Sequence, residues 1–274
     1  MQALSSPPPP LDRLISCFWY WETTPGSAPS HEFERLMPTG EASLVVQLNQ
    51  EPIRVYDWQD TTHFGSFGHA VLAGPRSEPF VIETSQQERV FGIQFHPGGT
   101  FPFFREPGRE FSNRDVCLSD LWGRGADRLR ERLLACASVQ AMFAAASATL
   151  LEQLVRPLAL HPAVTYAAAR MTAAPPRATV AALADEVGWS QRRLLDIFTE
   201  QIGLSPKSFC RVRRFQRVLH EVQRTRCMDW PQMALACGYY DQPHFIHDFR
   251  AFSGFTPTEY SARKTPHLNH VPLL

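Results

Sequence analysis

The chain has 274 residues, of which 44% are hydrophobic and 20% charged, a composition typical of a globular protein of one or two domains rather than of a disordered chain. No apolar run approaches the roughly 20 residues that a membrane span needs, and the first ten residues lack the pattern of a secretory signal, so we expect a cytoplasmic protein. The formal net charge is zero, but residues 161–274 contain 14 Lys and Arg against 9 Asp and Glu, whereas residues 1–160 contain 13 against 18. This asymmetry predicts two domains, of which the second is a candidate for binding a polyanion.

The first half of the chain predicts a β-rich domain. Residues 1–10 end in four prolines, and we expect them to form a disordered, proline-rich arm. Short apolar or alternating runs bounded by turn residues follow, and they favour a small barrel or sandwich. These predicted strands are Ser43–Leu48, Val71–Ala73, Phe80–Glu83 and Val90–Phe95.

The apolar spacing becomes helical from Leu118 onwards, which predicts helices at the end of the first domain. Three leucines in this region could either pack on the β-rich part or face a second copy of the chain. They are Leu150, Leu151 and Leu154.

A small β-barrel can enclose one ligand, and aromatic side chains on its strands are candidates for lining an effector pocket. The candidates are Trp19, Trp21, Phe91 and Phe95. Aromatic residues on strands form core more often than they line a pocket, so both interpretations stay open. The histidines of this region form no H-x-H pattern, the cysteines form no C-x-x-C pair, and common catalytic motifs do not occur. We therefore predict no enzyme, no metal site and no cofactor.

The strongest feature is an internal repeat in the last third of the chain. Seven positions recur at an offset of 50 or 51, with one extra residue in the second copy between Gly238 and Phe249. Each copy predicts a helix, a tight turn at a glycine and a second helix, which is the helix-turn-helix plan. Ser190 and Asp241 are the expected N-caps of the two second helices. The matched pairs are Ala184 and Ala234, Gly188 and Gly238, Trp189 and Tyr239, Phe198 and Phe249, Gly203 and Gly254, Pro206 and Pro257, and Phe209 and Tyr260.

A linker helix is predicted between the copies, from Pro206 to about Val222, because apolar residues keep helical spacing and proline suits a first turn. A helix of this length spans roughly 25 Å, so it can hold two reading helices in successive major-groove segments, which lie ~34 Å apart on one face of DNA. The same helix carries basic residues that we expect to contact phosphates. They are Lys207, Arg211, Arg214 and Arg217.

Residues 161–264 resemble the AraC/XylS family of bacterial transcription regulators. The resemblance is carried by VAALADEVGWSQRRLLDIFTEQIGLSPKSF and MALACGYYDQPHFIHDFRAFSGFTPTEY, of which the second is more specific, with G-Y-x-D-Q-x-H-F, then F, then G-F-T-P-x-x-Y. It implies an α+β protein with three parts: an N-terminal β-barrel or cupin-like domain with helices for sensing and dimerisation (11–157), an all-α DNA-binding domain of two helix-turn-helix units joined by a linker helix (161–264), and a tail (265–274).

The resemblance also implies which side chains read bases. They are Arg192, Leu195 and Asp196 in the first copy, and Gln242, His244, Ile246 and His247 in the second. Arginine can form two hydrogen bonds with guanine, and glutamine can form two with adenine. The family often has a basic residue where Asp196 and His247 stand. Phosphate repels a carboxylate at Asp196 unless it accepts a hydrogen bond from cytosine N4, so we expect the two copies to be unequal readers.

We therefore expect a sequence-specific transcription regulator controlled by a small-molecule effector in its N-terminal domain. Its partners are double-stranded DNA and the effector, and RNA polymerase and a second copy of the chain are further candidates. Two alternatives remain open at this stage. One is a constitutive DNA-binding regulator whose N-terminal domain only dimerises, and the other is a barrel enzyme fused to a DNA-binding domain.

Overall fold

Two antiparallel sheets form the N-terminal part of the computed structural model, which describes residues 2–23, 31–173, 179–225 and 228–273. The first sheet has the strand order β1 (Gln2–Ser5), β2 (Ile15–Glu22), β9 (Arg89–Phe95), β4 (Ser43–Gln47), β7 (Ala70–Ala73) and β10 (Asp115–Cys117). The second has the order β11 (His270–Leu273), β3 (Phe33–Leu36), β8 (Phe80–Glu83), β5 (Arg54–Tyr56) and β6 (Phe64–Ser66). All four strands predicted from the sequence are present.

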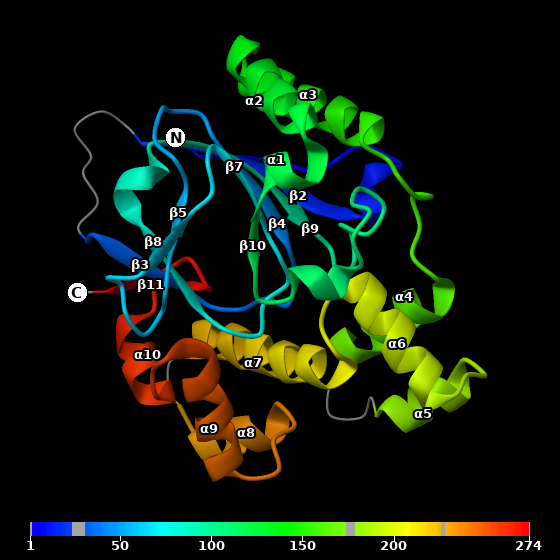
Figure 1. Cartoon of the computed structure of the whole chain (residues 1–274). Coiled ribbons are helices and arrows are strands. Elements are labelled where there is room, and N and C mark those ends of the chain that lie inside the picture. Colours follow the sequence, from blue (N-terminus) through cyan, green and yellow to red (C-terminus); the bar gives the residue numbers. More distant parts are fainter. Residues whose placement is uncertain (1, 24–30, 174–178, 226–227, 274) are drawn as a thin grey trace.

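Three helices cover one face of the first sheet, above it in Figure 1: α1 (Leu118–Trp122), α2 (Arg124–Ala135) and α3 (Val139–Glu152). Strand side chains alternate between the two faces, and those on this face form one apolar core with the helices. The ring of Phe18 lies 6.1 Å from that of Phe143 on α3. Leu150 is fully buried in the same core, so this leucine packs on the β-rich part.

The four aromatic residues predicted to line an effector pocket do not share a site, so that prediction was wrong. Tyr20 pairs with Phe91 across β2 and β9, which places Trp19 and Trp21 on the opposite face of the sheet from Phe91 and Phe95. Phe91 and Phe95 are fully buried in the core beneath the helices. The relative phase of two strands decides this arrangement, and composition does not reveal it.

Both ends of the chain form strands, which corrects two further expectations. Gln2–Ser5 belongs to the segment predicted to be disordered, yet it pairs in register with β2, because an extended edge can satisfy its backbone hydrogen bonds there. The segment predicted to be a tail contains β11, which pairs with β3 from His270 opposite Leu36 to Leu273 opposite Phe33.

The C-terminal part is helical: α4 (Pro162–Ala173), α5 (Val180–Glu186), α6 (Gln191–Ile202), α7 (Pro206–Arg224), α8 (Trp230–Ala236), α9 (Gln242–Ser253) and α10 (Pro257–Arg263). In Figure 1, α7 runs beneath the β-rich part, with α4 to α6 towards one of its ends and α8 to α10 towards the other. An all-helical part following a β-rich part confirms the expected fold class. Short 3-10 helices at Leu11–Arg13, Thr84–Gln87 and Gly108–Phe111 complete the chain.

The last strand fastens the helical part to the β-rich part. Val271 of β11 is fully buried in the apolar cluster of the second helical unit. Beside it, Glu34 of β3 lies 3.0 Å from Nδ1 of His270 and 2.9 Å from Nε2 of His31. Burial alone would raise the pKa of Glu34, but the hydrogen bonds and charges of the two histidines outweigh burial and lower it.

Replacement of Glu34 by glutamine tests this attachment. A lowered folded-state pKa means that Glu34 stabilises the fold above the unfolded carboxyl pKa of about 4.3, and that this contribution is lost as the pH falls through the folded-state pKa. We expect E34Q to unfold at a lower urea concentration than the parent at about pH 6, and the difference to shrink towards about pH 3. Glu32→Gln, at an exposed carboxyl, is the control. A difference that stays constant with pH would contradict the assignment.

Candidate nucleic-acid interface

The two helix-turn-helix units match element by element. Their first helices, α5 and α8, have seven residues each and N-caps at Thr179 and Asp229, an offset of 50. Their second helices, α6 and α9, have twelve residues each and N-caps at Ser190 and Asp241, an offset of 51. The extra residue of the second copy is therefore Tyr240, which stands in the turn just before α9 and is 87% exposed.

The turns follow from the residues that the repeat shares. Ala184 and Ala234 are buried, and their small side chains let the second helix of each unit approach closely. Gly188 and Gly238 have φ angles of +69° and +86°, in the left-handed region that glycine adopts without strain. The predicted N-caps are confirmed, since the side chain of Ser190 accepts from the backbone N–H of Arg193, and that of Asp241 accepts from the N–H of His244.

The first reading helix, α6, presents its predicted contacts to solvent. The side chains of Arg192 and Asp196 are 93% and 72% exposed, with Arg192 Nε 3.9 Å from Asp196 Oδ2 one helical turn away. Leu195 lies beside them and is also exposed. An exposed ion pair of this kind contributes little to stability, so both side chains are free to leave it for a base.

The second reading helix, α9, presents fewer of its predicted contacts. Gln242 and His247 are exposed. His244 is only partly exposed, with Nε2 3.7 Å from a carboxylate oxygen of Asp248. Ile246 is partly buried and packs against the core of the second unit. His247 Nδ1 also lies 3.7 Å from Oδ1 of Asp248, but its side chain is 79% exposed. Gln242 and His247 therefore lie at the surface, whereas His244 and Ile246 are held closer to the domain.

An ion pair between Asp248 and Arg211 joins α9 to α7. Only 2% of the Asp248 side chain is exposed, and its Oδ1 lies 2.7 Å from Nη2 of Arg211. Arg214 donates to the carbonyl of Gly238 at 3.2 Å, and its guanidinium lies over the ring of Tyr239. Both arginines were expected to contact phosphates, but tertiary contacts occupy them within the domain.

Lys207 and Arg217 remain exposed on α7. These two side chains are therefore the members of the predicted phosphate-binding set that the tertiary structure leaves at the surface.

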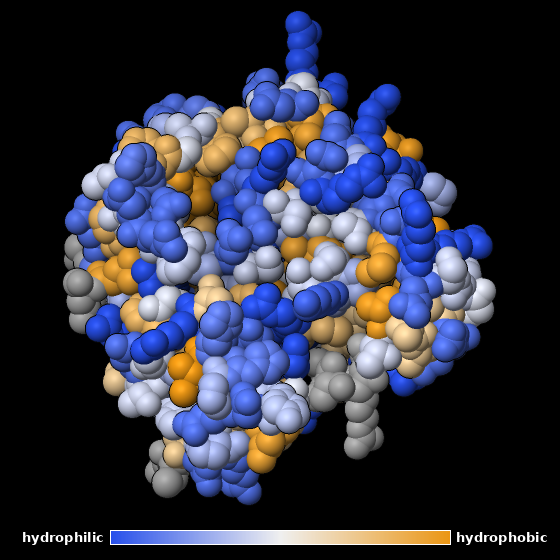
Figure 2. All heavy atoms as spheres, turned by 60° about the horizontal axis from the view of Figure 1, so that its bottom comes forward, coloured by the Kyte–Doolittle hydropathy of each residue, from blue (hydrophilic) through white to orange (hydrophobic). Residues whose placement is uncertain are grey.

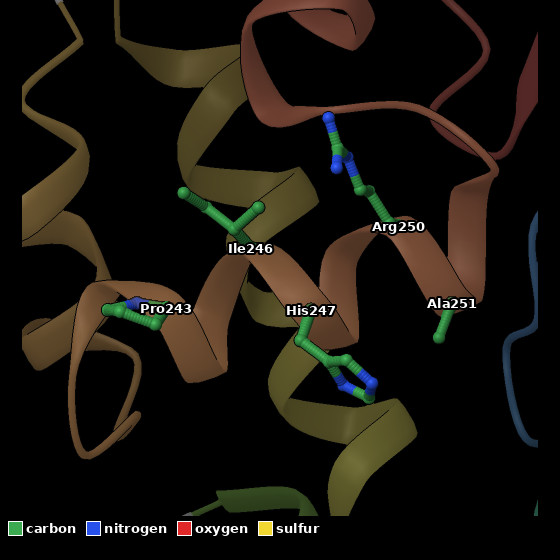
Figure 3. A pocket seen from close by; sticks show the side chains of 5 residues that line it. All are labelled: Pro243, Ile246, His247, Arg250 and Ala251. Atoms are coloured by element: carbon green, nitrogen blue, oxygen red, sulfur yellow. The ribbon is translucent and has the colours of Figure 1, made fainter.

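The reading surface is mainly hydrophilic with scattered apolar patches, as Figure 2 shows for the side that brings the bottom of Figure 1 forward. A depression of about 610 Å³ lies along α9, and Figure 3 shows the side chains that line it, namely Pro243, Ile246, His247, Arg250 and Ala251. Sequence reasoning missed three of these residues. The five lining residues recur at intervals of three and four positions, which places them on one face of the helix. This spacing is the signal that could have identified the three missed residues.

The described residues contain no helix that is long and apolar enough to cross a membrane. Nor do they bring together three or more His, Cys, Asp or Glu side chains in a way that could hold a metal ion.

Comparisons with known proteins agree with this geometry. Residues 183–263 match a family described as a helix-turn-helix domain, and residues 5–117 match a domain of unknown function (DUF6597). No curated protein sequence matches the chain. The helical region is thus a helix-turn-helix DNA-binding domain, and its resemblance to the AraC/XylS family is confirmed. In this region the chain therefore resembles AraC-type DNA-binding transcription regulators.

Three solved structures, of two regulators, are similar to the chain. An AraC-type transcriptional regulator from Chromobacterium violaceum is 29% identical over 39% of this chain and 95% of its own, with a TM-score of 0.36. ToxT from Vibrio cholerae is 10% identical over 89% of this chain and 97% of its own, with a TM-score of 0.47. ToxT from the same species bound to an unsaturated fatty acid is 10% identical over 88% and 93%, with a TM-score of 0.45.

Removal of Arg211 tests the connection between α7 and α9. Arg211→Ala leaves the carboxylate of Asp248 buried without its partner, and breaking a buried pair in this way costs about 3–5 kcal/mol. We expect a correspondingly lower free energy of unfolding, measured by urea denaturation. Lys207→Ala, at an exposed position on the same helix, is the matched control and should change stability by less than about 0.5 kcal/mol. Equal losses in both variants would contradict the proposed role of the ion pair.

Proposed function

We propose that α6 and α9 enter successive major-groove segments of one DNA site, and that a small-molecule effector bound by the N-terminal domain controls this binding. The observation that carries the proposal is that α7, 19 residues long and about 28 Å in length, packs against both units and fixes their spacing. We propose residues 161–264 as the DNA-binding domain, and residues 2–157 together with β11 as the effector domain.

The base contacts follow from the chemistry of the exposed side chains. In α6, Arg192 can donate hydrogen bonds to O6 and N7 of guanine, and Asp196 can accept one from the amino group of cytosine. The two side chains together therefore match a G·C step. Leu195 suits a thymine methyl group. In α9, Gln242 suits adenine, and His247 lies beside the apolar depression along the helix. The two units are therefore proposed to read unlike half-sites, with His244 and Ile246 in supporting roles.

Effector control is supported by contacts at the far ends of both reading helices. The backbone of Gly108 lies against the end of α6, where a Cβ on this glycine would come within 2.9 Å of the Glu200 carbonyl. Arg35 of β3 donates to the carbonyl of Ser253, the last residue of α9, at 3.2 Å. A ligand that shifts the N-terminal domain thus changes the relative positions of the reading helices. The ligand site and the DNA site are then linked by a coupling free energy. RNA polymerase and a second copy of the chain are further partners that we propose from the family resemblance alone.

Selection of bound sites from random double-stranded DNA tests the proposed reading residues. We expect one bipartite site, with a guanine in one half whose preference is lost in Arg192→Ala, at a cost of about 1–3 kcal/mol for that position. Arg193→Ala is the control, because the guanidinium of Arg193 lies over the ring of Trp189 within the same unit. The proposed function fails if purified parent protein enriches no site.

The salt dependence of binding tests the proposed phosphate contacts. Each neutralised phosphate contributes about 0.9 to the slope of log K against log salt concentration. We expect the double variant Lys207→Ala with Arg217→Ala to reduce this slope by about 2 and to weaken specific and nonspecific DNA binding alike. Fluorescence anisotropy at several salt concentrations measures the slope. A slope equal to that of the parent would remove both residues from the interface.

A further inference from the structure

The two reading helices can be compared residue by residue, because they have the same length and their N-caps, Ser190 and Asp241, lie 51 positions apart. The depression of about 610 Å³ lies on the face of α9 that corresponds to the exposed face of α6. Three charged side chains on that face of α6 are replaced on α9 by two apolar ones and a histidine. The corresponding pairs, with α6 first, are Arg192 and Pro243, Leu195 and Ile246, Asp196 and His247, Thr199 and Arg250, and Glu200 and Ala251.

The part of the depression near the start of α9 has no hydrogen-bonding side chain. In Figure 3, Pro243 lies in the first turn, Ile246 and Arg250 point to one side of the helix, and His247 and Ala251 point to the other. The side chains of Pro243 and Ile246 contain neither a donor nor an acceptor. A polar base edge that faced them would lose its bound water without gaining a hydrogen bond, which costs free energy. These two side chains therefore favour an apolar partner.

The major groove of DNA offers one apolar group to such a surface, which is the C5-methyl group of thymine. A cytosine that is methylated at C5 presents the same group at the same place in the groove. The other features that the base pairs present there are hydrogen-bond donors and acceptors. A 5-methylpyrimidine is thus the base whose groove edge matches the apolar part of the depression.

Charge and position favour DNA over a protein segment as the occupant of the depression. None of its five lining residues, all of which the structure describes, is acidic, and His247 and Arg250 are exposed at its border. Glu259 interacts electrostatically with Arg250, but its carboxylate accepts hydrogen bonds from the backbone N–H and the hydroxyl of Thr256. An apolar centre with basic side chains at its border matches base edges flanked by phosphates.

We propose that Pro243 and Ile246 form a surface that reads the 5-methyl groups of pyrimidines. The half-site under α9 then contains thymine, whereas Arg192 and Asp196 select a G·C step in the other half. Gln242, which precedes the apolar surface, can form two hydrogen bonds with adenine, so an A·T-rich half-site satisfies both. The proposal rests on the proposed function above, because it requires α9 to lie in the major groove.

Both side chains of this surface are held in place by the domain. Pro243 lies in the first turn of α9, where its ring fixes the backbone and its missing N–H costs no helical hydrogen bond. Ile246 is partly buried and packs against the core of the second unit. Carbon atoms in contact lie within about 4 Å of each other, and a surface that is already ordered loses little conformational entropy when a methyl group reaches it.

Removal of single methyl groups from the DNA tests the proposal. The full chain is titrated with its selected site, in which the α9 half is the one whose preferences survive Arg192→Ala. Deoxyuridine in place of thymidine removes the methyl group and keeps every hydrogen-bonding group of the base. We expect at least one such replacement in the α9 half to weaken binding about fourfold, the factor for one buried methyl group. Fluorescence anisotropy measures the affinities, and the same replacement outside both half-sites is the DNA control.

Cytosine and 5-methylcytosine at the sensitive position provide a second comparison. Cytosine changes the hydrogen-bonding edge as well as removing the methyl group, so we expect it to weaken binding. Methylation of that cytosine restores only the methyl group, and we expect it to recover about fourfold in affinity.

A variant of the reading surface separates methyl recognition from a general loss of binding. Pro243 is exposed and Ile246→Val is a small change, so the double variant Pro243→Ser with Ile246→Val should keep the fold. We expect its penalty for deoxyuridine to fall below about twofold, because less of the methyl group is covered. Arg192→Ala, on the other reading helix, is the matched control and should keep the full penalty. A purely structural role would weaken binding to the thymine and uracil sites equally.

The outcomes distinguish this inference from the proposed function. If selection returns no site, the proposed function fails and the inference fails with it. If a site is selected and every deoxyuridine replacement in the α9 half binds as well as thymidine, the inference alone is overturned, and the depression is left to another occupant such as a protein segment. An α9 half without thymine on either strand, or a double variant that keeps the full penalty, overturns it as well.

Discussion

The burial of α7 on several sides at once is the constraint on which the rest of the structure depends. Phe209 near its start belongs to the core of the first helix-turn-helix unit, whereas Phe215 and Leu219 belong to the core of the second. The N-terminal domain covers a further side, where Gln216 donates to the carbonyl of Pro38 at 2.8 Å. Because contacts on three sides of α7 fix its rotation, they set the spacing and relative orientation that α6 and α9 have in this structure.

The two reading helices obey the same local rules but carry different tertiary connections. The exposed side of α6 is free, since Arg192 and Asp196 interact only weakly with each other. In α9, the buried carboxylate of Asp248 pairs with Arg211 of α7 and lies close to His244. The second copy also has Tyr240 inserted before the helix. The proposal that the two units read unlike half-sites therefore rests on these tertiary differences as well as on the identity of their side chains.

The N-terminal domain contacts the helical part at the ends of the reading helices rather than on their exposed faces. Strand β11 extends the second sheet and places Val271 in the core of the second unit. Arg35 of the neighbouring strand reaches the end of α9, and Gly108 lies against the end of α6. Contacts of this kind leave the exposed faces of α6 and α9 open. They are also the contacts through which the proposed effector control would act, because a rigid helix carries a displacement from one end to the other.

The sequence by itself determined the two helix-turn-helix units, because glycines at left-handed positions, N-caps such as Ser190 and Asp241, and helical spacing act within a few residues of the chain. The strands from Ser43 to Phe95 were readable for the same reason. Only the tertiary structure decided the partner of Arg211, which is 37 residues away, and the pairing of both chain ends with distant strands. It also decided which sheet face each aromatic residue occupies, since this depends on strand register and on packing between segments that no local pattern encodes.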